Sequence, residues 1–150
     1  MLFVSANRRK NMMYDEELIA PMRQELADLG IVETKTPEAV DQYLATNKGT
    51  TLVVVNSVCG CAAANARPGV AAGLSRSVKK PDTAITVFAG NDRDATAKAR
   101  SYFVGYPPSS PTITLMKDGE VVFMLERHQI AGRDARELGD QIANAMNQYC

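Results

Sequence analysis

The sequence predicts an α/β fold in which helices flank a mixed central sheet, and three observations support this prediction. Residues 51–55 and 83–88 are continuously apolar and β-branched, which is typical of strands buried on both faces. Helix-type segments separate these strands along the chain, so the strands are expected to pair in parallel. The Asp118-Gly119 pair between two further strand-like runs is a strong hairpin signal and adds an antiparallel edge.

Length and composition favour one globular domain. The chain has 150 residues, with 45% hydrophobic residues and 17 basic against 17 acidic side chains. This balance gives no indication of a nucleic-acid or anionic-membrane partner. Residues 1–12 are expected to be an unstructured N-terminal extension ahead of a domain at residues 13–150. The opening apolar run precedes its basic cluster, the reverse of a secretory signal, and no later run could span a bilayer, so we expect a cytoplasmic protein.

The first helix is predicted from Tyr14 onward. Asp15, Glu16 and Glu17 place negative charge where a helix begins, and Gly30 is a plausible stop. Pro21 lies inside the pattern, so the helix either begins late or bends there. Apolar residues at helical spacing predict the buried face: Leu18, Met22, Leu26 and Leu29.

The middle of the chain predicts alternating elements. Residues 31–35 are predicted to form a short strand. Thr36 and Pro37 then predict the start of a second helix, whose side chains Val40, Tyr43 and Leu44 are expected to face the core. Residues 62–78 are rich in alanine and predict a helix with a kink near Pro68 and Gly69.

The remaining elements follow from the same rules. Residues 95–102 predict a helix and residues 104–108 a loop, and the hairpin strands are residues 111–116 and 121–125. A last amphipathic helix begins near residues 133–134 and buries Leu138, Ile142, Ala145, Met146 and Tyr149.

The sharpest chemical feature is Cys59-Gly60-Cys61, where a buried strand meets a helix. Catalytic groups favour this position beyond the carboxyl end of a strand, and the N–H groups of a helix start stabilise a thiolate. Because Cys59 lies at or before the helix start, our hypothesis makes it the nucleophile and Cys61 the resolving thiol.

The spacing of the two cysteines makes a disulfide between them feasible but strained. Cα atoms two residues apart are separated by roughly 5.5–7 Å, which overlaps the upper part of the disulfide range. Gly60 is the residue best able to absorb the distortion. Since strain makes a disulfide more reducible, we expect a less reducing couple than thioredoxin, whose potential is about −270 mV.

Two other interpretations of the cysteine pair remain open. Both cysteines could be small buried hydrophobic residues. They could also belong to a metal or iron–sulfur module, although only Cys150 and His128 offer further soft ligands. An absorption spectrum with metal analysis of anaerobically purified protein, and its loss on Cys59→Ser, would distinguish the metal module.

Three isolated residues have a chemical and a simpler interpretation. His128 could tune a thiol, but a solvated loop residue is the simpler expectation. Cys150 could be a third redox thiol or a frayed terminal residue. Arg67 could bind an anionic thiol or be a solvated charge on a helix.

A proline supports the redox interpretation. Pro111 begins a predicted edge strand, and the Ser110–Pro111 bond could be cis, which would leave the preceding backbone free to pair with an extended thiol substrate. This signal is weak alone because prolines at strand starts are common. Together with the cysteine turn it becomes specific.

With both motifs in place, the order of elements resembles the thioredoxin fold with an additional N-terminal helix. The local sequence further resembles the bacilliredoxin family from about Met13 to the C-terminus. Four segments carry this resemblance, and the CGC stretch is the most specific: 13–18 with 20–23, 56–69, 106–111 and 126–128.

The resemblance implies a thiol–disulfide oxidoreductase that removes bacillithiol from mixed disulfides on client proteins. Cys59 would attack the mixed disulfide and take the thiol, and Cys61 would resolve an intermediate. Gly60, Ser110 and Pro111 would bind substrate. The expected partners are S-bacillithiolated clients and a low-molecular-weight thiol or reductase for regeneration. Bacillithiol would be a substrate, with no tightly bound cofactor, and a protein disulfide isomerase is the alternative enzyme.

Overall fold

A five-stranded sheet forms the centre of the computed structural model, which describes residues 13–150. The strand order is β1-β3-β2-β4-β5. β3 pairs in parallel with β1 and β2, whereas β4 pairs antiparallel with β2 and β5. The expected mixed sheet is therefore present, and the expectation for residues 1–12 lies outside the described part. The strands are β1 (Val32–Glu33), β2 (Thr50–Asn56), β3 (Thr83–Phe88), β4 (Thr112–Lys117) and β5 (Glu120–Leu125).

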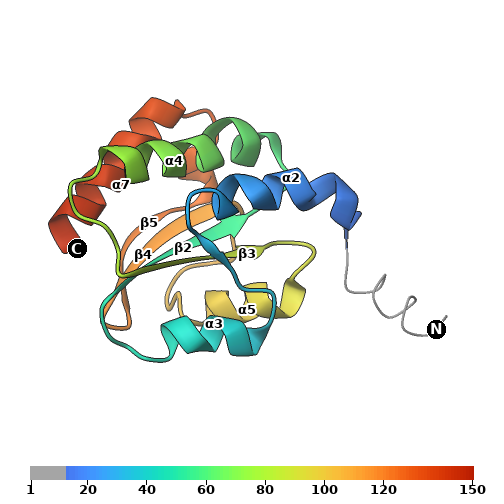
Figure 1. Ribbon diagram of the computed structural model, residues 1–150, viewed down its shortest axis with the longest axis horizontal. Helices are drawn as coiled ribbons and strands as arrows, with labels where there is room; N and C mark the ends of the chain where they lie inside the picture. The colour runs from blue at the N-terminus through green and yellow to red at the C-terminus, as the bar shows by residue number, and fades with distance from the viewer. Residues whose placement is uncertain (1–12) are drawn as a thin grey trace.

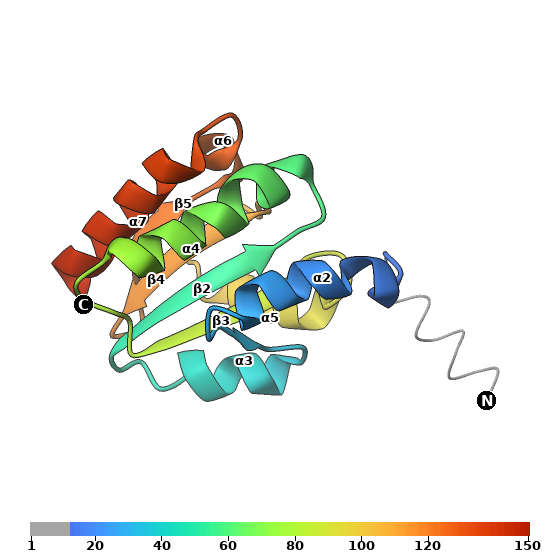
Figure 2. The same cartoon turned by 45° about the horizontal axis from the view of Figure 1, so that its top comes forward.

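Helices cover both faces of this sheet (Figure 1). One face carries α2 (Glu16–Ala27), α4 (Arg67–Arg76) and α7 (Ala135–Tyr149), and the other carries α3 (Pro37–Leu44) and α5 (Arg93–Ser101). α2 is the additional N-terminal helix that the sequence predicts. In the turned view of Figure 2, α4 and α7 run side by side over β2, β4 and β5, and α2 lies beside them.

The central strand β2 divides the core into two clusters. All of its residues are buried, and successive side chains point to opposite faces. Leu52 and Val54 pack in the cluster under α4 and α7, while Val53 and Val55 pack against α3 and α5. Burial on both faces explains why this strand has no polar face in the sequence.

The predicted start and turn signals are confirmed. The Thr36 side chain accepts a hydrogen bond from the backbone N–H of Ala39, 3.2 Å away, and so caps α3. Asp118 and Gly119 both have positive φ, 51° and 85°, as a tight hairpin turn requires. Asp134 caps α7 through the N–H of Arg136.

The predicted buried face of the first helix is only partly correct, because Leu26 is buried but Leu18 and Leu29 are exposed. α2 begins at its Asp15 cap, ahead of Pro21, and buries Ile19, Arg23 and Leu26. Leu18 is 58% exposed. Arg23 determines which side of α2 faces the sheet. Its guanidinium pairs with Glu16 in the same helix and with Asp92, and it lies 5.1 Å from the centre of the Phe88 ring. Asp92 and Phe88 are both more than 60 residues away in the sequence.

Two local features differ from the sequence expectation. The helix after the cysteines begins as a π-helix at Ala62–Ala66 before α4, with the Arg67 N–H bonded to the carbonyl of Ala62, so the expected irregularity near Pro68 takes this form. A short unpredicted helix, α6 (Arg127–Ile130), follows β5 and is capped by Glu126. Within residues 13–150 we find no helix long and apolar enough to span a membrane.

Candidate active site

The cysteine turn lies between the end of β2 and the helical segment that leads into α4. The carbonyl of Cys59 accepts the backbone N–H groups of Ala62 and Ala63 at 3.0 and 3.2 Å. The first helical turn therefore begins at Cys59, as the sequence predicts. Cys59 and Cys61 are partly exposed and Gly60 is exposed, so the turn is accessible to a substrate.

The structure brings the two thiols together. Both cysteines are free, and their Sγ atoms lie 2.7 Å apart. The two sulfurs are thus in direct contact, so a thiol at one position can stabilise a thiolate at the other.

The environment favours the thiolate at Cys59. Partial burial by itself would raise the pKa of this thiol. Hydrogen bonds from the Cys61 thiol, the Ser57 hydroxyl and the Ala62 backbone N–H, together with the positive charge of Arg127, outweigh burial and lower the pKa of Cys59. A thiolate is the reactive form in disulfide exchange, so this residue has the character of a nucleophile.

Cys61 has the opposite tendency. Burial raises its pKa, and so do its hydrogen bond to Cys59 and the charge of the Cys59 thiolate. Arg127 and the backbone N–H of Cys61 oppose these effects without reversing them. Cys61 therefore keeps its proton when Cys59 is ionised, which is the state expected of a thiol that acts second.

A buried polar cluster fixes the entry to the turn. Arg67 is 5% exposed, and its Nη1 donates to Asn56 Oδ1 at 3.0 Å and to the Ser57 carbonyl at 2.9 Å. Its Nε pairs with Glu25 of α2. Asn56 Nδ2 in turn donates to the Met22 carbonyl of α2 at 3.0 Å. Of the two interpretations of Arg67, the solvated charge is therefore wrong, because this buried side chain connects α2 to the end of β2.

Ser57 completes this cluster on the side of the thiols. Its Oγ accepts the backbone N–H of Cys59 at 3.2 Å, and its hydroxyl hydrogen-bonds to the Cys59 sulfur. Sequence reasoning missed Ser57, although its position directly before the cysteine turn was a usable signal.

The Ser110–Pro111 peptide bond is cis, as the sequence suggests. Pro111 does not begin an edge strand, however, because β4 lies between β2 and β5. The strand that follows Pro111 is therefore paired on both sides, with β2 and β5. The Ser110 carbonyl accepts a long hydrogen bond of 3.4 Å from Arg127 Nη1.

Arg127 links this loop to the cysteines, and the sequence did not single it out. Its backbone N–H donates to Ser109 Oγ at 2.8 Å, and its charge acts to lower the pKa of both thiols. A cavity of about 400 Å³ lies beside it, between the 107–109 loop and residues 126–131. Its sequence signals were its position directly after a strand and its place in the 126–128 segment that resembles the bacilliredoxin family.

His128 and Cys150 lie outside this hydrogen-bonded group. The His128 side chain is 74% exposed on α6, so it is solvated but helical. Cys150 ends α7 with its N–H bonded to Met146, and it packs against the core rather than fraying. The C-terminus lies at the opposite end of the sheet from the β2–helix junction (Figure 1). Among residues 13–150, no three His, Cys, Asp or Glu side chains form a group that could hold a metal ion.

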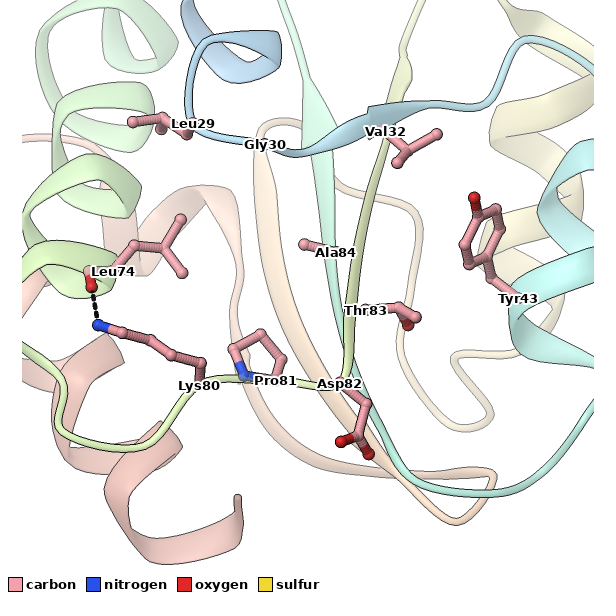
Figure 3. A pocket seen from close by; sticks show the side chains of 10 residues that line it. All are labelled: Leu29, Gly30, Val32, Tyr43, Leu74, Lys80, Pro81, Asp82, Thr83 and Ala84. Atoms are coloured by element: carbon pink, nitrogen blue, oxygen red, sulfur yellow. Dashed lines mark hydrogen bonds between the residues drawn. The ribbon is translucent and has the colours of Figure 1, made fainter.

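A second cavity, of about 550 Å³, lies at the amino end of β3 (Figure 3). Leu29, Val32, Leu74 and Tyr43 supply much of its wall, and Thr83 and Ala84 lie between them. No cysteine or histidine lines it. Its lining thus offers no thiol for disulfide exchange.

Comparisons with known proteins agree with this chemistry. Residues 14–150 match the family described as disulphide isomerase. The chain is 50% identical to a bacilliredoxin of Bacillus licheniformis, covering 91% of this chain and 95% of that protein. It is 48% identical to a bacilliredoxin of Koribacter versatilis, with 92% and 94% covered, and 49% identical to one of Geobacillus kaustophilus, with 91% and 94% covered.

A solved structure supports the fold. This chain is similar to a protein with a thioredoxin fold, described as a candidate oxidoreductase, with a TM-score of 0.52 and 15% identity. The similarity covers 75% of this chain and 92% of that one. The expected thioredoxin-like fold is confirmed.

Proposed function

The chain belongs to the bacilliredoxin family of thiol–disulfide oxidoreductases, and we propose that it removes bacillithiol from mixed disulfides on client proteins. The observation that carries this proposal is Cys59, an accessible thiol of lowered pKa with a second thiol 2.7 Å away. The names of its relatives support bacillithiol as the thiol involved. Its working place under this proposal is the cytoplasm, where client thiols are otherwise kept reduced.

The reaction proceeds by two thiol–disulfide exchanges. The Cys59 thiolate attacks the bacillithiol sulfur of the mixed disulfide, a Cys59–bacillithiol disulfide forms, and the client leaves as a thiolate that takes a proton from solvent. Cys61 then attacks the Cys59 sulfur and releases bacillithiol, which leaves a Cys59–Cys61 disulfide. Alternatively, a second low-molecular-weight thiol attacks the bacillithiol sulfur and restores the Cys59 thiolate directly. A reductase or excess thiol regenerates the dithiol in the first case.

The test is to incubate the protein with a bacillithiolated client and to measure intact masses. The Cys61→Ala variant should release the client and keep one bacillithiol on Cys59, because the resolving thiol is absent. Cys59→Ser should release none. Cys150→Ser is the matched control and should behave like the unmodified protein.

Two results would contradict the proposal. A bacillithiol adduct on Cys61 or Cys150 would show that one of these thiols, and not Cys59, attacks the mixed disulfide. A client that stays modified in the presence of the full dithiol protein would exclude the activity itself.

Disulfide isomerisation is a second candidate function, favoured by the family description and by the proximity of the two sulfurs. It uses the same Cys59 attack on a protein disulfide, with Cys61 as the escape from a trapped intermediate. The Cys61→Ala variant separates the two functions, since bacillithiol removal should survive it, whereas isomerisation should slow because the Cys59–client intermediate is no longer released by Cys61. Reactivation of a protein with scrambled disulfides measures the second activity.

A further inference from the structure

We propose that Arg127 and the cavity beside it form the binding site for the carboxylate-bearing part of the low-molecular-weight thiol whose sulfur becomes joined to Cys59. This inference rests on the proposed function and adds the feature that would select the thiol. It concerns the part of the substrate that does not react.

The cavity has the size and walls of a small-molecule site. Its volume of about 400 Å³ lies within the usual range for ligand pockets, roughly 300–1,000 Å³. Pro107 and Pro108 supply rigid apolar walls on one side, and Glu126, Arg127 and His128 lie on the other. An apolar wall that faces a cation suits a ligand with a neutral body and an acidic end.

Hydrogen bonds join the 107–109 loop, which forms one wall of the cavity, to α5 and to the start of α6. The Ser109 carbonyl accepts from Arg100 Nη2 at 3.1 Å, and Ser109 Oγ accepts the backbone N–H of Arg127 at 2.8 Å. The loop and the start of α6 are therefore fixed relative to each other without using the Arg127 side chain. A preformed site of this kind loses little freedom when a ligand binds.

The Arg127 guanidinium retains unused donors. Four other arginines of residues 13–150 pair with carboxylates, while Arg93, Arg100 and Arg136, like Arg127, do not: the pairs are Arg23 with Glu16 and Asp92, Arg67 with Glu25, Arg76 with Asp140 and Arg133 with Glu137. Within residues 13–150, Arg127 has no such partner, and its side chain makes only the 3.4 Å bond to the Ser110 carbonyl. The carboxylate of Glu126 is held by the backbone N–H of Gln129. A planar guanidinium with free N–H groups is suited to bidentate binding of a carboxylate.

Arg127 also lies at the right place relative to the reacting sulfur. Its charge acts on Cys59, and its Nη1 reaches the backbone directly before Pro111. A thiol joined to Cys59 would therefore extend past the cis-proline loop toward this cation. Thiols without a carboxylate would forgo the contact, which makes Arg127 a residue that determines thiol specificity.

The experiment compares one client peptide capped either with bacillithiol or with 2-mercaptoethanol, which has no carboxylate. Arg127→Met should lower kcat/KM for the bacillithiol cap about tenfold, the loss expected for a charge-assisted hydrogen bond. After correction for the fraction of Cys59 thiolate, taken from the pH profile of alkylation, the mercaptoethanol cap should change by less than about twofold. Arg127→Lys should restore part of the loss because it keeps the charge without the planar geometry.

Controls separate this inference from its alternatives. Arg133→Met removes another exposed arginine near the same helix and should change neither cap. Equal corrected losses for both caps would overturn the inference, because Arg127 would then act only through the Cys59 charge. The inference would also be overturned if the loss of kcat/KM in Arg127→Met changed with the net charge of the client peptide, because Arg127 would then bind the peptide and not the thiol. Failure of the unmodified protein to release bacillithiol, with the mercaptoethanol cap still removed, would instead reject the proposed function.

Discussion

The two ends of the central sheet each carry a cavity, yet only one end is equipped for chemistry. The amino-end cavity is the larger, about 550 Å³ against about 400 Å³. Its lysine, Lys80, is already engaged, since Nζ donates to the Ser77 carbonyl at 2.7 Å and closes α4. The cavity at the carboxyl end is lined by Arg127, which has no carboxylate partner in residues 13–150, and the two thiols lie at the same end of the sheet. Cavity size is therefore a poorer guide to the site than uncommitted polar groups.

The polar residues at the two ends also serve different purposes. At the amino end, the Asp82 carboxylate accepts the backbone N–H of Thr50 at 2.9 Å, which connects the segment before β3 to the start of β2. At the carboxyl end, Arg67 donates a hydrogen bond to Asn56 and so fixes the backbone at the end of β2. Ser57 then accepts the backbone N–H of Cys59 and positions the reactive thiol. Side-chain hydrogen bonds to the backbone occur at both ends, but only those at the carboxyl end position a reactive thiol.

The largest expected effect comes from removing that support. Arg67→Met should lower the free energy of unfolding by about 2–4 kcal/mol, because Asn56 Oδ1 and the Ser57 carbonyl would stay buried without a charged donor. Chemical denaturation measures the loss. Arg93→Met, at an exposed arginine of α5, is the matched control and should change stability by less than about 0.5 kcal/mol. A small loss at Arg67 would mean that the cluster is not what holds the carboxyl end in place.

A smaller effect is expected at the thiol itself. Alkylation of Cys59 should rise with pH through its pKa, and because that pKa is lowered, the rise should occur below the range of an ordinary thiol. Ser57→Ala removes a hydrogen bond to the thiolate, so the profile should move to higher pH. Below both midpoints the rate should fall about fivefold, the factor that a hydrogen bond of about 1 kcal/mol represents.

Iodoacetamide labelling of Cys59, followed by peptide mass spectrometry at a series of pH values, measures this shift. Ser75→Ala, at an exposed serine of α4, is the control and should leave the profile in place. An unchanged profile in Ser57→Ala would assign the lowered pKa to Cys61, Ala62 and Arg127 alone.

The sequence predicted the carboxyl end of β2 as the site because its signals there are local. A buried strand, the CGC turn and the helix behind it are contiguous, and the parallel pairing of β2 with β3 followed from the alternation of elements. The supporting residues were harder to predict. Arg67 meets Glu25 forty-two residues away, and Arg127 reaches Ser110 across a hairpin. Their roles depend on tertiary contacts that no local pattern records, and the same reason explains why Arg23 displaced the predicted face of α2.

The smallest expected effect tests the other end of the sheet. Leu29→Ser opens the wall of the amino-end cavity at a residue that is 36% exposed, and Ala84→Leu fills the cavity from β3. Neither change alters a thiol, a charge or a hydrogen bond at the carboxyl end, so bacillithiol removal should stay within about twofold of the unmodified rate while stability shifts by no more than about 1 kcal/mol. Client-release kinetics alongside thermal melting measure both quantities. If either variant slows release at unchanged stability, the amino-end cavity takes part in client capture, and the contrast between a reactive and an inert end no longer holds.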